Sequence, residues 1–205
     1  MRKKAACLLV IVFTLLMISS CSANKTKAED IEVPEDLCAF MVSVIGKDVK
    51  TAEKMVEKKY GLTLTRIGPE YKNSNIDNKP NYDSYHYDVS FTEQGITFSG
   101  LSLEYSHLKK SREDGIVYCI GFSTGSMSVK EAEECYKMFS DYFYGQLGVT
   151  GFTNTDAFDS DDYCTSSNFI KDGYTYHVEY YYSGYHDSAS LTVYCMSHAE
   201  EFYVF

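Results

Sequence analysis

One pentapeptide near the middle of the chain has residue types that could carry nucleophilic chemistry. Residues 121–125 read Gly-Phe-Ser-Thr-Gly and lie between a predicted strand and a predicted helix. A serine on a sharp strand-to-helix turn can act as a nucleophile when an acid and then a histidine follow it in the chain. The candidates for Ser123 come in that order: Asp156, Asp159 or Asp161 as the acid, and His177, His186 or His198 as the base.

The elements that must position Ser123 favour another interpretation. The α/β-hydrolase scaffold needs parallel strands joined by crossover helices, whereas one helix and then tight hairpins are predicted after Ser123. That helix also begins at Ser128, too late for a sharp elbow. We interpret the pentapeptide as a strand-to-helix loop with Ser128 as the helix cap, and an envelope serine hydrolase stays the alternative.

A histidine followed two residues later by an acid occurs twice, as His86 with Asp88 and as His177 with Glu179. Alternate residues of a strand share a face, so each pair is adjacent, as a metal site or acid–base chemistry requires. The residues between and beside them are mostly aromatic or aliphatic and make the better core. We therefore expect the histidine face to meet water and to form cross-strand ion pairs, with metal binding the less favoured hypothesis.

The segment 154–162 gathers side-chain oxygens of the kind that calcium prefers. Its register does not match an EF-hand loop, because Phe158 stands where a ligand is needed and no glycine follows. We expect an acidic, solvated loop. The sequence has no glycine-rich phosphate loop before a helix, and we predict no cofactor.

The first 21 residues form a leader. Residues 2–4 are basic, residues 5–18 are apolar, and the segment Ile18-Ser19-Ser20-Cys21 closes the run. The apolar run is shorter than the roughly 20 residues of a membrane span. The closing segment resembles the lipobox of bacterial lipoproteins. The resemblance implies cleavage between Ser20 and Cys21, and a diacylglyceryl thioether on Cys21 that anchors the protein to the outer side of the cell membrane.

The remaining chain is acidic. Without residues 1–20 it has 185 residues, and Lys plus Arg fall from 19 to 16 against 29 acidic residues, a net charge of −13. Such a chain does not bind nucleic acid through general electrostatics, and anionic lipid would repel it. We therefore expect a membrane contact through the acyl anchor, a polar tether over residues 21–33, and one domain over residues 34–205.

Five cysteines remain once the leader is removed and Cys21 is lipidated. Their number is odd, none are in C-x-x-C spacing, and each lies in an apolar pattern, so we expect small buried hydrophobes. The disulfide pattern is left open. The five are Cys38, Cys119, Cys135, Cys164 and Cys195.

Hydrophobic periodicity predicts three helices. The first begins near Pro34 and ends at Gly46. The second follows Asp48 as N-cap and ends at Gly61, and the third runs from Ser128 to Gly148. The stripe of the first helix consists of Leu37, Phe40, Met41, Val44 and Ile45.

Alternating patterns predict the strands 62–67, 85–91, 96–105, 116–122, 150–155, 163–170, 174–183 and 189–197. A change of phase at Ser99-Gly100 predicts a bulge. Lys171-Asp172-Gly173 predicts a hairpin in which Phe169 pairs with Tyr176. Tyr163, Tyr180 and Tyr182 then lie on the face of that pair.

The two halves of the domain have similar patterns. Residues 48–53 align with 128–133 at the start of a helix, and Val117-Tyr118-Cys119 matches Val193-Tyr194-Cys195. In each half, 34–125 and 126–205, the pattern predicts helix followed by about four antiparallel strands. This order resembles the tandem repeat of beta-lactamase-inhibitor-protein-like envelope lipoproteins. We predict an α+β fold of two such halves.

Tyrosine is abundant, with 19 copies and no tryptophan. Tyrosine suits half-buried strands, and it also suits recognition surfaces. We therefore expect a lipid-anchored, non-catalytic binding protein in the bacterial cell envelope, whose sheets could present a concave aromatic face to a protein, peptide or glycan. Besides the serine hydrolase, the fold resemblance leaves a protein inhibitor or assembly factor open.

Overall fold

The computed structural model describes residues 31–67, 71–72, 82–106, 115–157 and 162–199. The part of the chain from Val33 onward forms one compact unit. Cys21, Ser20 and the rest of the leader lie outside the described residues, so the lipid anchor stays a prediction. The architecture is α+β, as expected.

Three helices are described, and local capping fixes their ends. α2 (Leu37–Val44) begins at the N-cap Asp36, α3 (Val49–Tyr60) at Asp48 and α4 (Val129–Leu147) at Ser128. Each N-cap side chain accepts a hydrogen bond from a backbone N–H of the first turn. α3 and α4 end at left-handed glycines, as predicted. None of the described helices is both long and apolar enough to cross a bilayer.

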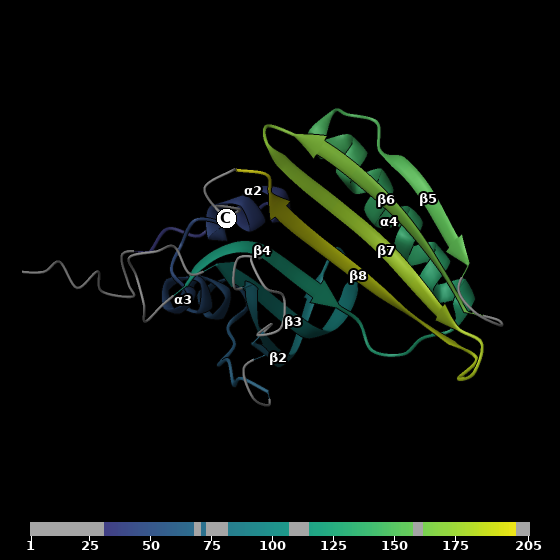
Figure 1. Cartoon of the computed structure of the whole chain (residues 1–205), viewed down its shortest axis with the longest axis horizontal. Helices are drawn as coiled ribbons and strands as arrows, with labels where there is room; N and C mark the ends of the chain where they lie inside the picture. Colours follow the sequence, from purple (N-terminus) through teal and green to yellow (C-terminus); the bar gives the residue numbers. More distant parts are fainter. Residues whose placement is uncertain (1–30, 68–70, 73–81, 107–114, 158–161, 200–205) are drawn as a thin grey trace, which may run out of the picture. The chain divides into compact units, whose positions relative to one another are not determined.

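The strands form one eight-stranded antiparallel sheet in the order β1-β2-β3-β4-β8-β7-β6-β5 (Figure 1). The strands are β1 (Tyr71–Lys72), β2 (Tyr82–Glu93), β3 (Ile96–Ser106), β4 (Ile116–Ser123), β5 (Phe152–Ala157), β6 (Tyr163–Lys171), β7 (Tyr174–Ser183) and β8 (Ser188–Ser197). The strand predicted over 62–67 is wrong. That segment contributes only an isolated bridge between Arg66 and Tyr87.

The strand order places the last strand of each half at the centre of the sheet. β4 pairs with β8, and Ile120 lies opposite Cys195. In each half, helices precede four strands that follow one another in the sheet. This element order agrees with the predicted one, while the tandem sequence repeat itself stays a prediction.

The β6–β7 hairpin has a turn that needs positive φ. Asp172 has a φ of 52° and Gly173 one of 83°, and the resulting register pairs Phe169 with Tyr176 as predicted. The phase change in β3 is also present. Between the pairs Asp88–Gly100 and Phe91–Phe98, β2 has two residues where β3 has only Ser99, so the extra residue of the bulge belongs to β2.

The aromatic residues form the core beneath the helices. The ring of Phe143 on α4 lies 5.7 Å from that of Phe169 and 5.6 Å from that of Tyr176. Tyr87 and Tyr105 are 1% exposed. Figure 1 shows α4 passing behind β5, β6 and β7, so the viewer sees the other face of these strands. The expected aromatic ligand-binding face is thus wrong for these residues, because helix packing buries them.

The five cysteines of the domain are all free thiols, and four are buried. Burial raises the pKa of Cys38 to about 12 and raises the pKa values of Cys119 and Cys195 as well. A thiol with a raised pKa is protonated at neutral pH and is a poor nucleophile. The four buried cysteines therefore pack as small hydrophobic residues, as expected, whereas Cys135 is only partly buried.

Candidate functional site

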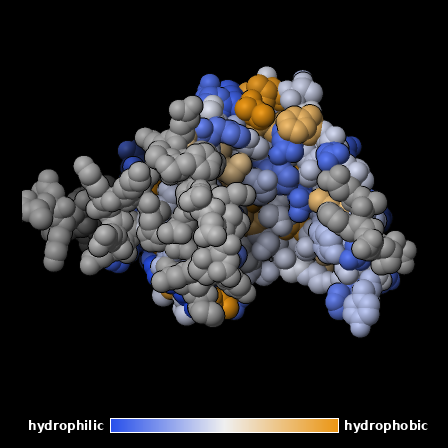
Figure 2. Space-filling view, viewed as in Figure 1, coloured by the Kyte–Doolittle hydropathy of each residue, from blue (hydrophilic) through white to orange (hydrophobic). Residues whose placement is uncertain are grey.

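The sheet face opposite the helices holds a continuous run of polar side chains, which we call the polar stripe. Its residues alternate with the buried Tyr176, Val178 and Tyr180 of β7 and with the buried Leu191 and Val193 of β8. The stripe comprises Thr175, His177, Glu179, Tyr181 and Ser183 of β7, and Ser188, Ser190, Thr192 and Tyr194 of β8. Figure 2 shows this side of the molecule, where pale and blue atoms predominate over these strands and orange occupies small areas.

His177 is the centre of a hydrogen-bonded network in this stripe. Its Nδ1 lies 2.8 Å from Oδ1 of Asn168, and its Nε2 lies 3.3 Å from Oε2 of Glu179. The imidazole is stacked on the ring of Tyr194, and the residue is only 5% exposed. Both ring nitrogens are engaged, so the network holds His177 in one orientation.

Neighbouring groups shift the pKa values of two acidic side chains in this network. The hydrogen bond with His177 lowers the pKa of Glu179, and the thiol of Cys164 adds a second hydrogen bond. Burial and the nearby carboxylates of Glu179 and Glu104 raise the pKa of Tyr194 to about 12. The phenol of Tyr118 donates to Oε2 of Glu104 at 2.7 Å, so the polar contacts extend to β3 and β4.

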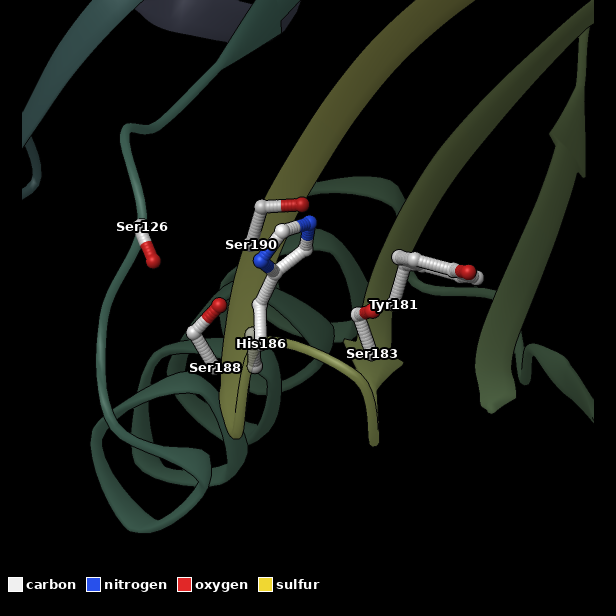
Figure 3. Close-up of a pocket in the computed structure, with 7 residues that line it drawn as sticks. Ser126, Tyr181, Ser183, His186, Ser188 and Ser190 are labelled. Atoms are coloured by element: carbon white, nitrogen blue, oxygen red, sulfur yellow. The ribbon is translucent and has the colours of Figure 1, made fainter. Parts of the chain in front are cut away.

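One end of the stripe opens into a pocket of about 560 Å³. In Figure 3, Ser126 stands on one side and Tyr181 and Ser183 of β7 on the other, with His186 and the β8 serines between them. Ser126 comes from the segment that joins β4 to α4, and His186 comes from the β7–β8 hairpin. The full lining is Ser126, Tyr181, Ser183, His186, Ser188, Ala189 and Ser190.

Asp162 holds one wall of this pocket. Its Oδ2 accepts a hydrogen bond from the phenol of Tyr181 at 2.6 Å, and its Oδ1 accepts one from the backbone N–H of Gly184 at 2.7 Å. These two bonds, with smaller contributions from Ser183 and His186, lower the pKa of Asp162. Both oxygens are thus used to fix the hairpin, and neither hydrogen-bonds His186.

Ser123 is a strand residue. It is the last residue of β4 and pairs with Gly100 and Thr192. The chain stays extended beyond it, since the backbone N–H of Thr124 donates to the carbonyl of Leu191 at 2.9 Å. The sharp elbow that a nucleophilic serine needs is therefore missing.

The candidate bases do not reach Ser123. His177 is engaged by Asn168 and Glu179, and the imidazole of His198 hydrogen-bonds the hydroxyl of Thr175. The residues that the structure describes include no hydrogen bond between Ser123 and a histidine. Of the candidate acids, Asp156 lies in β5, while Asp159 and Asp161 lie outside the described residues.

The two His-x-acid pairs lie on one face of the sheet but are far apart. β3, β4 and β8 separate β2 from β7, which at ordinary strand spacing is roughly 19 Å. His86 and Asp88 are exposed, as expected. His177 is buried by its neighbours, so the expected solvation is wrong there, and its partner Glu179 is on the same strand rather than across from it. Within the described ranges, His, Cys, Asp and Glu side chains form no group of three that could hold a metal ion.

The oxygen-rich segment 154–162 is not wholly a loop. Residues 154–157 belong to β5, where Asn154 pairs with Ser166 and Asp156 with Cys164. The strand predicted over 150–155 already covers residues 154–155, and the loop prediction is wrong for 156–157, because backbone pairing with β6 extends further than the polar composition indicates. Residues 158–161 lie outside the described residues.

Sequence reasoning missed several residues of the site, namely Asn168, Tyr194, Asp162 and the pocket serines. A signal existed for Asn168, because the predicted pair of Phe169 with Tyr176 places Asn168 opposite His177. The approach of Ser126 and Asp162 to β7 and β8 has no such local signal.

No protein-family model, curated protein or solved structure matches this chain.

Proposed function

We propose that this protein is a lipid-anchored, extracytoplasmic binding protein that uses the polar stripe and its pocket to hold a ligand. The observation that carries the proposal is the one-sided packing of the helices. α4 covers the face with Tyr176 and Tyr180, and hydrogen-bonding side chains and an open pocket occupy the opposite face of β7 and β8. Such pockets with a few convergent polar groups are typical of ligand sites.

The proposed location rests on the leader. Its basic start, its short apolar run and Cys21 after Ser19-Ser20 support removal of residues 1–20 and acylation of Cys21. Two acyl chains give stable anchoring where one is marginal. The acidic domain supports the need for such an anchor, since anionic lipid would repel it.

Metabolic labelling with a palmitate analogue tests the anchor. Label is expected on the native chain, with loss in Cys21→Ala and retention in Cys7→Ala, because Cys7 lies in the cleaved leader. Label that survives Cys21→Ala would contradict the proposal. Protease added to protoplasts or spheroplasts, whose cytoplasmic membrane is intact, should remove the domain, and complete protection would place it on the wrong side of that membrane.

A fluorophosphonate probe tests the non-catalytic part of the proposal. We expect no labelling of the purified chain, because Ser123 is a strand residue and no histidine among the described residues hydrogen-bonds it. Labelling that Ser123→Ala abolishes would establish a serine hydrolase instead.

A further inference from the structure

We infer that the pocket at the end of the polar stripe binds a neutral saccharide. The inference rests on the proposed binding function and names its ligand class. It comes from four features of the pocket: its hydroxyl groups, its fixed wall, its exposed aromatic ring and its charge.

The hydroxyl groups of the pocket are available to a ligand. The side chains of Ser126, Ser188, Ser190 and His186 make no hydrogen bond to any described residue. Each serine hydroxyl can both donate and accept a hydrogen bond. The complementary ligand carries groups that do the same at close spacing, and the hydroxyl groups of a sugar ring have this chemistry.

The wall that carries Tyr181 and Ser183 is fixed before any ligand arrives. Asp162 accepts hydrogen bonds from the phenol of Tyr181 and from the backbone N–H of Gly184. Tyr182 on the same hairpin donates to Oδ1 of Asp187 at 3.2 Å. A pocket that is ordered in advance loses less entropy on binding, which suits a ligand of many weak hydrogen bonds.

An exposed aromatic ring stands next to the pocket. Tyr185 is 90% exposed, and its ring meets the ring of His186 edge to face at 4.8 Å and 84°. The hairpin thus presents a large apolar surface directly after Gly184 and before a lining residue. Tyr is well suited to this role, since it combines a rigid apolar body with a polar tip. The C–H face of a pyranose ring can stack on such a surface.

The charge of the pocket excludes anionic ligands. Among the described residues no lysine or arginine lines it, and the Asp162 carboxylate lies behind its wall. The domain as a whole is strongly acidic. A phosphate or sulfate group would find no cationic partner, so the ligand class is a neutral sugar. The volume of about 560 Å³ lies within the range of small-molecule sites.

The test uses the full mature chain in detergent and saturation-transfer NMR with maltose, cellobiose and N,N′-diacetylchitobiose as probes. We expect transfer to at least one of these neutral disaccharides, and a dissociation constant weakened about tenfold or more by Tyr185→Ala and by Ser190→Ala. The matched controls Tyr144→Ala and Ser99→Ala change an exposed tyrosine and an exposed serine outside the pocket lining, and they should bind like the native chain.

Three outcomes would overturn the inference. They are no transfer to any of the three probes at millimolar concentration, binding that Tyr185→Ala and Ser190→Ala leave unchanged, and a preference for glucose 6-phosphate over glucose. Failure here is distinguishable from failure of the proposed function. Intact Cys21 labelling with no sugar binding rejects the saccharide alone, whereas loss of the labelling result rejects the anchored location.

Discussion

The imidazole of His177 is stacked on the ring of Tyr194, with the ring centroids 4.2 Å apart and the planes at 17°. Tyr194 itself lies opposite Gly121 of β4. A Cβ at Gly121 would be 3.4 Å from Cβ of Tyr194 and 2.7 Å from Oγ of Ser102. A side chain at Gly121 would therefore clash with Ser102 and come into ordinary contact with Tyr194, which in turn covers His177.

Removing the imidazole should destabilise the fold. His177→Ala deletes the stack and removes the imidazole partner of Asn168 and of Glu179, which costs about 1–3 kcal/mol in the free energy of unfolding. Urea unfolding measures it. His86→Ala is the matched control on the same sheet face, and because His86 is exposed its cost should stay below about 0.5 kcal/mol. Equal losses in the free energy of unfolding for the two variants would contradict a stabilising role of the His177 network.

The Glu179 carboxylate should make the free energy of unfolding depend on pH in the acidic range. Its pKa is lowered in the folded state below the ordinary value of 4.5, so its contribution to stability is present above pH 4.5 and is lost as the pH falls through the folded value. Glu179→Gln should therefore lower the urea midpoint at neutral pH more than below pH 4.5. Glu134→Gln, in an exposed pair with Lys130, should change little at either pH. A pH-independent effect of Glu179→Gln would contradict the assignment.

Buried phenols should limit stability in alkali. Desolvation raises the pKa of Tyr180 and of Tyr194 to about 12, and it raises those of Tyr60, Tyr87 and Tyr176 further. The folded state keeps these phenols neutral, so stability falls as the pH rises from 10, the unfolded value, through the folded values. Tyrosinate absorbance and near-ultraviolet circular dichroism should therefore change together above pH 10. A single titration near pH 10 with unchanged dichroism would rule this out.

A side chain at Gly115 should disturb the core. A Cβ there would run into the ring of Tyr105, which is 1% exposed and stacked on Tyr85. The carbonyl of Gly115 also accepts a hydrogen bond from the backbone N–H of Val49. Gly115→Ala should cost about 1–3 kcal/mol in thermal or urea unfolding. Gly125→Ala, whose Cβ would meet only Ser99 Oγ at 3.6 Å, should cost less, and the reverse order would show that Tyr105 is free to move.

Local signals in the sequence were sufficient to predict the helices and one hairpin. Asp48, Ser128 and Gly61 act within a single turn, so their positions are readable without knowledge of distant residues. The turn at Asp172-Gly173 is local in the same way, and it fixed the register of β6 with β7.

The site depends on contacts that no local pattern encodes. The alternation of polar and apolar residues along β7 correctly placed His177 on the sheet face opposite the aromatic residues. It could not show that the ring of Tyr194 would cover the imidazole of His177. Likewise, the G-x-S-x-G spacing at Ser123 does not reveal whether the backbone turns or stays extended, and pairing with Leu191 decides this. The pocket brings Ser126 beside the β7–β8 hairpin through the order of the strands.

The place of β8 between β4 and β7 has a consequence for how the chain folds as it is synthesised. All seven other strands precede β8 in the chain, yet β8 joins the two groups of four at the middle of the sheet. A nascent chain therefore cannot complete its sheet until Ser188–Ser197 has been synthesised, and such long-range pairing is slow to form. Late closure leaves the two groups of four strands unjoined until then, which is compatible with the export that we propose.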